Sequence, residues 1–389
     1  MKKVLLAFAC ILFMISCSSD LESTTYHEKG VENIVLRDKV AISILKEYSK
    51  NVSLNQTKSI GTSNMKVINT KHSCYKLKAV VDKSLPLATK ASDLELPDSV
   101  QVNLCTIEFI KDNKLGFAIV GIDEGVEKVY AYTDNGLLSD TCDIPALSET
   151  LGNIKFICRD DIVKAKVEKN LNNQNSVRMT SDIKFPNMHS WGNIYPYNKY
   201  FPKSDCTWNE QYQGYQSSHW TAVSIATCLD WLDHNKSQSS SDGFAKKFLE
   251  VSDGAGKHHR RCYPMPVGTS DSFHIASLEA YLQNKYPNKW EMERKQKSLN
   301  VEKVINTLRN GMPVVISTTS ASHGVVSWIF DGGHFMLGTN QGNQISDLYC
   351  LWGKDGKCDG WYVNYYQPSD TNVPYAQNGK GFKQFLYFK

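Results

Sequence analysis

Residues 311–337 read GMPVVISTTSASHGVVSWIFDGGHFML, and this stretch decides the fold class. Gly311 and Pro313 end a helix-like segment, and runs of β-branched and aromatic residues follow them, bounded by small and polar residues. This pattern predicts three strands, at 314–318, 325–330 and 334–337.

The rest of the second half is helical before this stretch and strand-like after it. Apolar residues recur at helical spacing in 221–232, 275–282 and 301–309. Further strand-like runs cover 348–352, 361–366 and 382–388. Helices first and strands last predict an α+β domain with segregated halves over residues 185–389.

The first half reads as a smaller α+β unit over residues 34–163. Its expected elements are a helix at 34–48, strands at 75–81, 102–110, 116–122 and 128–133, and a short helix at 145–154. The expected buried face of the first helix is Leu36, Val40, Ile44 and Tyr48, with Ala41 and Leu45 beside it. Residues 164–184 are the expected linker, read either as a passive loop or as a processing site at Arg178 or Lys184.

The first seventeen residues, MKKVLLAFACILFMISC, have the pattern of a bacterial export signal. Two lysines precede an apolar run of about twelve residues, which is too short to span a bilayer. The end of the run resembles a lipobox, which implies lipid attachment at Cys17 and a polar tether over 18–33. The expected location is the bacterial cell envelope, anchored by lipid to the outer membrane. An ordinary secretory signal cleaved nearby is the alternative.

The composition indicates a globular protein. The 389 residues are 41% apolar and 22% charged, with a net charge of +4. These values exclude a disordered tail, a collagen, a coiled coil and a polytopic membrane protein. The net charge is too small to indicate a nucleic-acid partner, so none is expected. The expected contact with a membrane is the lipid anchor alone.

Four fragments of the second half occur in a specific order. They are Trp191-Gly-Asn193, Ser217-Ser218-His219-Trp220-Thr221-Ala222, Gly324-Val-Val326-Ser-Trp328-Ile-Phe-Asp331-Gly332 and Leu351-Trp352-Gly353. Their order and spacing resemble the streptopain family of papain-like cysteine peptidases. In the first half, residues 116–123 and 129–136 resemble that family's propeptide, a streptopain-inhibitor-like (Spi-like) module. The resemblance implies a small Spi-like α+β prodomain followed by a papain-like cysteine-peptidase domain.

Catalysis in that family requires a thiolate at a helix N-terminus, a histidine, an oxyanion donor and an amide that orients the histidine. The matching positions hold Ser218 for the cysteine, Val326 for the histidine, Asn193 for the glutamine and Leu351 for the asparagine. The resemblance therefore implies a pseudopeptidase. It would bind a peptide or protein in the degenerate cleft, or regulate an active relative, with the prodomain packed on the second domain. The alternatives are an active peptidase that uses His323 as a displaced base, and a surface adhesion or structural protein.

Two further features allow more than one interpretation. Trp328 and Trp352 either line the cleft or fill the core. Residues 257–262, KHHRRC, could bind an anion or a metal ion. Because no second cluster lies at ligand spacing, a solvated loop is the favoured interpretation of this run, and neither a metal nor a cofactor is expected.

The cysteine count is odd. Of eleven cysteines, Cys10 lies in the signal and Cys17 is assigned to lipid, so nine remain and at least one is unpaired. Cys350 and Cys358 are the first candidate pair, because they lie close together around a turn. None of the other thiols considered as nucleophiles has the helix-start setting that would activate it; they are Cys206, Cys228 and Cys350.

Overall fold

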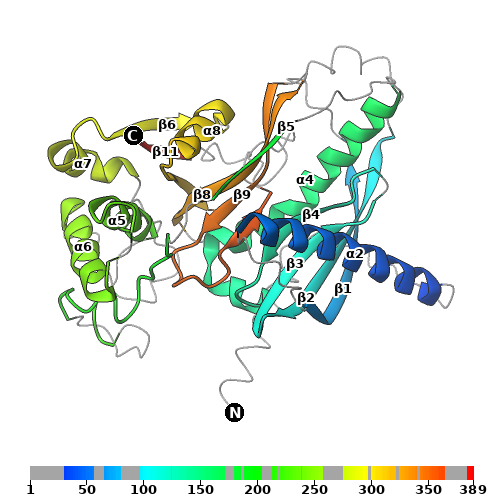
Figure 1. Ribbon diagram of the computed structural model, residues 1–389, viewed down its shortest axis with the longest axis horizontal. Coiled ribbons are helices and arrows are strands. Elements are labelled where there is room, and N and C mark those ends of the chain that lie inside the picture. The colour runs from blue at the N-terminus through cyan, green and yellow to red at the C-terminus, as the bar shows by residue number, and fades with distance from the viewer. Residues whose placement is uncertain are drawn as a thin grey trace.

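The computed structural model describes residues 30–56, 65–79, 97–123, 125–170, 179–184, 188–203, 213–216, 220–237, 239–256, 275–296, 299–320, 324–339, 342–363 and 383–389. These residues form a mixed α+β fold, as predicted (Figure 1). No helix within the described ranges combines the length and the apolar character needed to cross a membrane.

One antiparallel sheet runs through the described part of the chain. Its order is β1-β2-β3-β4-β10-β9-β8-β7-β11-β6, and β5 pairs with β8 outside this path. The strands from the first half are β1 (Met65–Lys78), β2 (Ser99–Lys111), β3 (Lys114–Gly121) and β4 (Lys128–Thr133). The others are β5 (Met179–Lys184), β6 (Trp290–Gln296), β7 (Val314–Ser320), β8 (Gly324–Thr339), β9 (Gly342–Leu351), β10 (Gly360–Tyr362) and β11 (Lys383–Phe388).

The two halves of the chain meet in this sheet where β10 pairs with β4. Trp361 lies opposite Tyr132, and Tyr362 lies opposite Ala131. The Val363 amide extends the pairing by donating to the Tyr130 carbonyl at 2.9 Å. The strands of the two halves are therefore continuous, whereas the division into two domains remains a prediction.

Two long helices cover opposite faces of β1–β4 (Figure 1). They are α2 (Gly30–Gln56) and α4 (Pro145–Asn170). Side chains alternate along β2, so that Val102 packs in the cluster that includes α4, whereas Ile107 packs in the cluster that includes α2. Strand β2 is therefore buried on both sides. The 3-10 helix η1 (Leu138–Asp143) connects β4 to α4.

The structure describes several helices in the second half, and one of them, α5 (Trp220–Asp233), is buried along its length. The others are α6 (Ser241–Gly254), α7 (Glu279–Lys285), α8 (Val301–Arg309) and the 3-10 helix η3 (Ile275–Leu278). Every residue of α5 from Thr221 to Trp231 is buried. A helix that is buried on all sides lies inside a core. Accordingly, α5 lies between α6 and strands β7 and β8.

Helix α2 buries a different face from the predicted one. Leu36 and Val40 are 60% and 39% exposed, whereas Ala41 and Leu45 are fully buried. The buried stripe continues through Ser49, whose hydroxyl lies 3.2 Å from the Tyr132 hydroxyl. Because Ser49 is polar, the sequence favours the neighbouring stripe, which ends in Tyr48, as the core face.

Two other local expectations differ from the structure. Within the predicted linker, the described residues 164–170 and 179–184 are regular structure, because α4 extends to Asn170 and β5 pairs with β8. The glycines at 332 and 333 do not form a turn between two strands but lie inside the single strand β8. Close packing requires a glycine at position 333, since a Cβ there would lie 2.5 Å from the Phe335 ring. Helix α6 and strand β6 were not anticipated.

The predicted Cys350–Cys358 disulfide is also wrong, because Cys358 forms no disulfide. The Cys350 thiol donates to the Leu348 carbonyl at 3.6 Å, whereas the Cys358 thiol contacts the Leu137 carbonyl at 4.0 Å. The two side chains thus have different neighbours despite their closeness in sequence.

Replacing Gly360 should separate the two halves of the sheet. A Cβ at Gly360 would lie 2.2 Å from the Tyr132 carbonyl oxygen of β4. We expect Gly360→Ala to lower the free energy of unfolding by about 3 kcal/mol, since backbone cannot move aside easily. The matched control is Gly152→Ala in α4, where a Cβ would meet nothing within 4 Å. This control should raise the free energy of unfolding by about 0.5–1 kcal/mol. Urea unfolding followed by circular dichroism measures both, and equal effects would contradict the packing argument.

Candidate functional site

The candidate site lies at the start of helix α5, where two other segments contact the helix and a third contacts one of those two. The Thr221 hydroxyl in the first turn of α5 lies 2.6 Å from the Ser327 hydroxyl of β8. Gly353, just after β9, packs against Trp220, because a Cβ there would lie 3.4 Å from the indole ring. The Gly353 amide donates to the Ser190 hydroxyl at 2.7 Å. The structure thus brings together segments of all four fragments.

The segment around Asn193 is held in place by aromatic packing. Trp191 stacks on Phe244 of α6 with ring centroids 5.0 Å apart and an interplanar angle of 14°. Tyr197 contacts both rings edge-on. Asn193 follows Trp191 in this segment and is buried.

Val326 and Leu351 lie in the buried core. Val326 belongs to β8 and pairs with Thr318, and Leu351 ends β9 and pairs with Ile329. Each side chain is 1% exposed. Aliphatic groups cannot accept or donate a proton, so neither position can perform general acid–base chemistry.

The two tryptophans near these positions also pack in the core. The rings of Trp328 and Trp352 lie 5.7 Å apart at 34°, and each residue is 1% exposed. The Asp359 carboxylate accepts a hydrogen bond from the Trp352 backbone amide at 2.8 Å, which fixes the position of Trp352. Neither indole lines an open surface in this structure.

Several predicted site residues lie outside the described residues. They are Cys17, Cys206, Ser218, the run 257–262 and His323. Their assigned roles remain predictions, including the displaced-base alternative for His323. The lipid attachment at Cys17 likewise stays a prediction.

The described buried thiols are poorly suited to nucleophilic attack. Burial raises the pKa of Cys158 and of Cys358 to about 12. Burial, together with the charge of Asp331, raises the pKa of Cys228 well above its ordinary value. A catalytic cysteine needs the opposite shift, because the thiolate is the nucleophile. These three thiols are therefore protonated at neutral pH.

The loop after Trp352 is bound by the first half of the chain, which the sequence did not indicate. The Asn135 side chain donates to the Gly356 carbonyl at 2.8 Å, and the Cys358 amide donates to the Asn135 carbonyl at 2.6 Å. An ion pair of 2.7 Å joins Lys357 to Asp140. Contacts more than 200 residues apart leave no local pattern in the sequence.

The same loop carries a polar cluster near the Trp191 segment. Asp355 accepts a bond from the Tyr197 hydroxyl at 2.5 Å and lies 3.0 Å from His189 Nε2. Burial and the Asp355 carboxylate raise the pKa of Tyr197 above its ordinary value. The phenol is therefore a hydrogen-bond donor that orients this loop, not a base.

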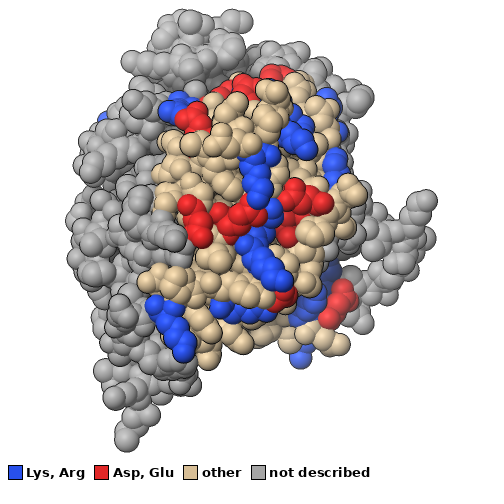
Figure 2. All heavy atoms as spheres, turned by 90° about the vertical axis from the view of Figure 1, so that its left-hand side faces the viewer, with Lys and Arg blue, Asp and Glu red and all other residues tan. Residues whose placement is uncertain are grey.

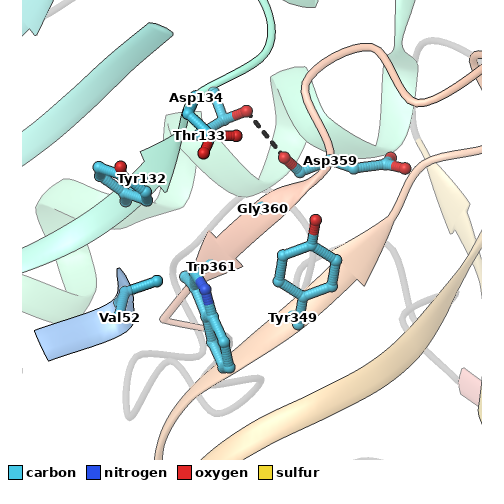
Figure 3. A pocket seen from close by; sticks show the side chains of 8 residues that line it. All are labelled: Val52, Tyr132, Thr133, Asp134, Tyr349, Asp359, Gly360 and Trp361. Carbon is cyan, nitrogen blue, oxygen red and sulfur yellow. Dashed lines mark hydrogen bonds between the residues drawn. The ribbon is translucent and has the colours of Figure 1, made fainter. Parts of the chain in front are cut away.

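A small hollow lies at the seam between β4 and β10, away from the start of α5 (Figure 3). It is lined by Val52, Tyr132, Thr133, Asp134, Tyr349, Asp359, Gly360 and Trp361. The Thr133 hydroxyl donates to the Asp359 carbonyl at 2.7 Å across the seam. This bond joins the two halves and leaves little room for a ligand.

Acidic and basic side chains are interspersed on the face formed by the second-half helices (Figure 2). Lys247 lies between Asp233 and Glu250, at 2.7 and 3.1 Å. Lys303 pairs with Glu293 at 2.9 Å. Paired charges of both signs do not build the one-signed field that a polyanion requires.

No protein-family model matches this chain, and no curated protein matches it. The family resemblance therefore rests on the quoted motifs.

A double-mutant cycle tests the link between α5 and β8. Thr221→Val and Ser327→Ala each remove one member of a buried hydroxyl pair, and each should destabilise by about 1–2 kcal/mol. The double variant should lose less than the sum of the two, with a coupling of about 1 kcal/mol. Chemical denaturation of the four proteins measures the coupling. Strict additivity would show that the two hydroxyls do not interact.

Proposed function

We propose that this chain is a catalytically inactive, streptopain-like protein that acts by binding a peptide or protein. The observation that carries the proposal is the identity of two buried side chains, one in β8 and one at the end of β9. Val326 and Leu351 occupy the positions where the resemblance expects the histidine and the asparagine, and both are buried aliphatic residues. Removal of the base and of its orienting group removes the chemistry while preserving the packing.

The contact between segments supports a retained scaffold. In the proposed relationship, the helix start that carries Ser218 faces the strand that carries Val326. The 2.6 Å contact between Thr221 and Ser327 supports this proposal to the extent that the first turn of α5 packs on β8, the strand that carries Val326. The proposed binding region is the surface around this helix start.

The first half of the chain supports a second element of the proposal. A Spi-like prodomain would cover the second domain, and residues 133–140 contact the loop over 354–359 through Thr133, Asn135 and Asp140. Without autolysis to remove it, this cover is permanent. The partner would then bind the assembled chain and not a released second domain.

The proposed setting is the bacterial cell envelope. The signal-like residues 1–17 and the lipid attachment at Cys17 carry this part of the proposal. No cofactor and no nucleic acid are required by the proposed activity.

Activity-based labelling tests the inactive assignment. We expect neither an E-64-like probe nor a fluorophosphonate to label the chain, and we expect casein to stay intact. Labelling at Ser218 that is lost in Ser218→Ala would contradict the proposal and support the active peptidase with a displaced base.

Restoring two catalytic groups tests the retained scaffold. The double variant Ser218→Cys with Val326→His should gain labelling by the E-64-like probe, because an imidazole beside the thiol lowers its pKa. The matched control is Ser218→Cys alone, which supplies the thiol without the new imidazole. It should remain unlabelled. If both variants or neither are labelled, the proposed equivalence of Val326 is wrong.

Hydrogen exchange tests the cover by the first half. Asn135→Ala removes the side-chain bond to the Gly356 carbonyl, and the loss of about 1 kcal/mol should speed amide exchange over 354–359 roughly fivefold. Lys76→Ala, at an exposed site of β1, is the control and should change nothing there. Unchanged exchange in both variants would indicate that this contact does not hold the loop.

A further inference from the structure

Three side chains with different donor atoms converge on one point between α2 and the edge of the sheet. They are Asp38 of α2, His72 of β1 and Cys105 of β2, and one ligand atom from each lies within 4.8 Å of the other two. The Asp38 carboxylate lies 2.7 Å from His72 Nε2, and the Cys105 sulfur lies 3.9 Å from the same nitrogen.

The fold positions these residues through the pairing of β1 with β2. His72 lies directly opposite Cys105 in the antiparallel register, so both side chains point to the same face of the sheet. Cys105 belongs to the buried cluster that α2 covers. Asp38 reaches the pair from the first half of that helix.

The geometry differs from that of a catalytic relay. In a relay, one ring nitrogen of the histidine contacts the nucleophile and the other contacts the carboxylate. Here both the carboxylate and the sulfur approach the same nitrogen, His72 Nε2. Three donors directed at a common centre are the arrangement of ligands around an ion.

We propose that Asp38, His72 and Cys105 form a binding site for a divalent transition-metal ion such as zinc or cobalt. Ligand atoms about 2.0–2.3 Å from a tetrahedral ion lie roughly 3.3–3.7 Å from one another. The separations of 2.7 and 3.9 Å bracket this range, so small side-chain rotations complete the site. Binding of the ion would release the proton of the Cys105 thiol to solvent. The resulting carboxylate, thiolate and neutral imidazole carry two negative charges, which balance the ion.

The donor set determines the class of metal. Thiolate and imidazole favour zinc, cobalt, nickel and copper, whereas magnesium and calcium prefer oxygen donors. The side chains of Asp38 and His72 are 27% and 24% exposed, so an ion can enter from solvent. The fourth position is left to water.

The ion would fix the outer half of α2 to the edge strand β1. Among the side chains of α2 described from Val35 onward, Val35, Leu36 and Val40 are exposed, and the first buried one is Ala41. Asp38 is therefore a contact that joins the turns before Ala41 to the sheet. Metal binding should order these turns.

Cobalt binding to the full chain tests the proposal. We expect one equivalent of Co²⁺ to bind and to give a near-ultraviolet thiolate-to-cobalt charge-transfer band and visible bands of tetrahedral cobalt. Zinc should displace the cobalt, and magnesium should not. At a hundredfold excess over its dissociation constant, zinc should raise the free energy of unfolding by about 2.7 kcal/mol. It should also slow amide exchange over 35–41.

Variants separate this site from adventitious binding. Cys105→Ser should abolish the charge-transfer band, and Asp38→Asn, which keeps the side-chain shape, should weaken binding at least tenfold. Cys74→Ser is the matched control, because Cys74 is an exposed thiol on the same strand two residues from His72. It should bind cobalt like the parent chain. The proposal is overturned if no stoichiometric binding occurs, or if Cys74→Ser loses binding while Asp38→Asn keeps it.

Discussion

Strand β10 has three residues, and its pairing with β4 joins the sheet of the first half to the sheet of the second. The seam depends on a glycine, since any side chain at Gly360 would meet the carbonyl of Tyr132. Hydrogen bonds on both sides of the short strand also join the two halves; they involve Thr133, Asn135 and Val363. The short strand is stabilised by these flanking bonds, because three residues of ladder alone would be weak.

The candidate site depends on this seam through the loop that follows Trp352. One end of the loop packs on α5 through Gly353, and its other end enters β10 at Gly360. The first half of the chain therefore restrains a loop whose beginning contacts the helix start. A change in the docking of residues 133–140 would reach the candidate site by this route.

The sequence predicts several helices and strands, but it does not predict which of them contact one another. Strand β4 and helix α8 have the predicted bounds, because each has a clear periodicity with turn signals at both ends. The face of α2 could not be predicted, since Ser49 is buried only because Tyr132, from a distant strand, offers its hydroxyl. The contact of Thr221 with Ser327 places the helix start on β8, and the four fragments indicated this proximity only through the family resemblance.

In the proposed relationship, the aliphatic residues at the candidate site have a thermodynamic consequence besides the loss of chemistry. A buried imidazole or amide must be hydrogen-bonded, and an unpaired one costs about 1–3 kcal/mol. Val326 and Leu351 carry no such requirement, so the strands beside α5 can pack closely without polar partners. The cluster of Asp38, His72 and Cys105 is the reverse case, because it concentrates donor groups where an apolar core would suffice. In the proposed relationship, the exchange of polar groups for aliphatic ones at the first place adds stability there. At the second place the donor groups contact one another, and the proposed cation would replace these contacts with bonds to itself.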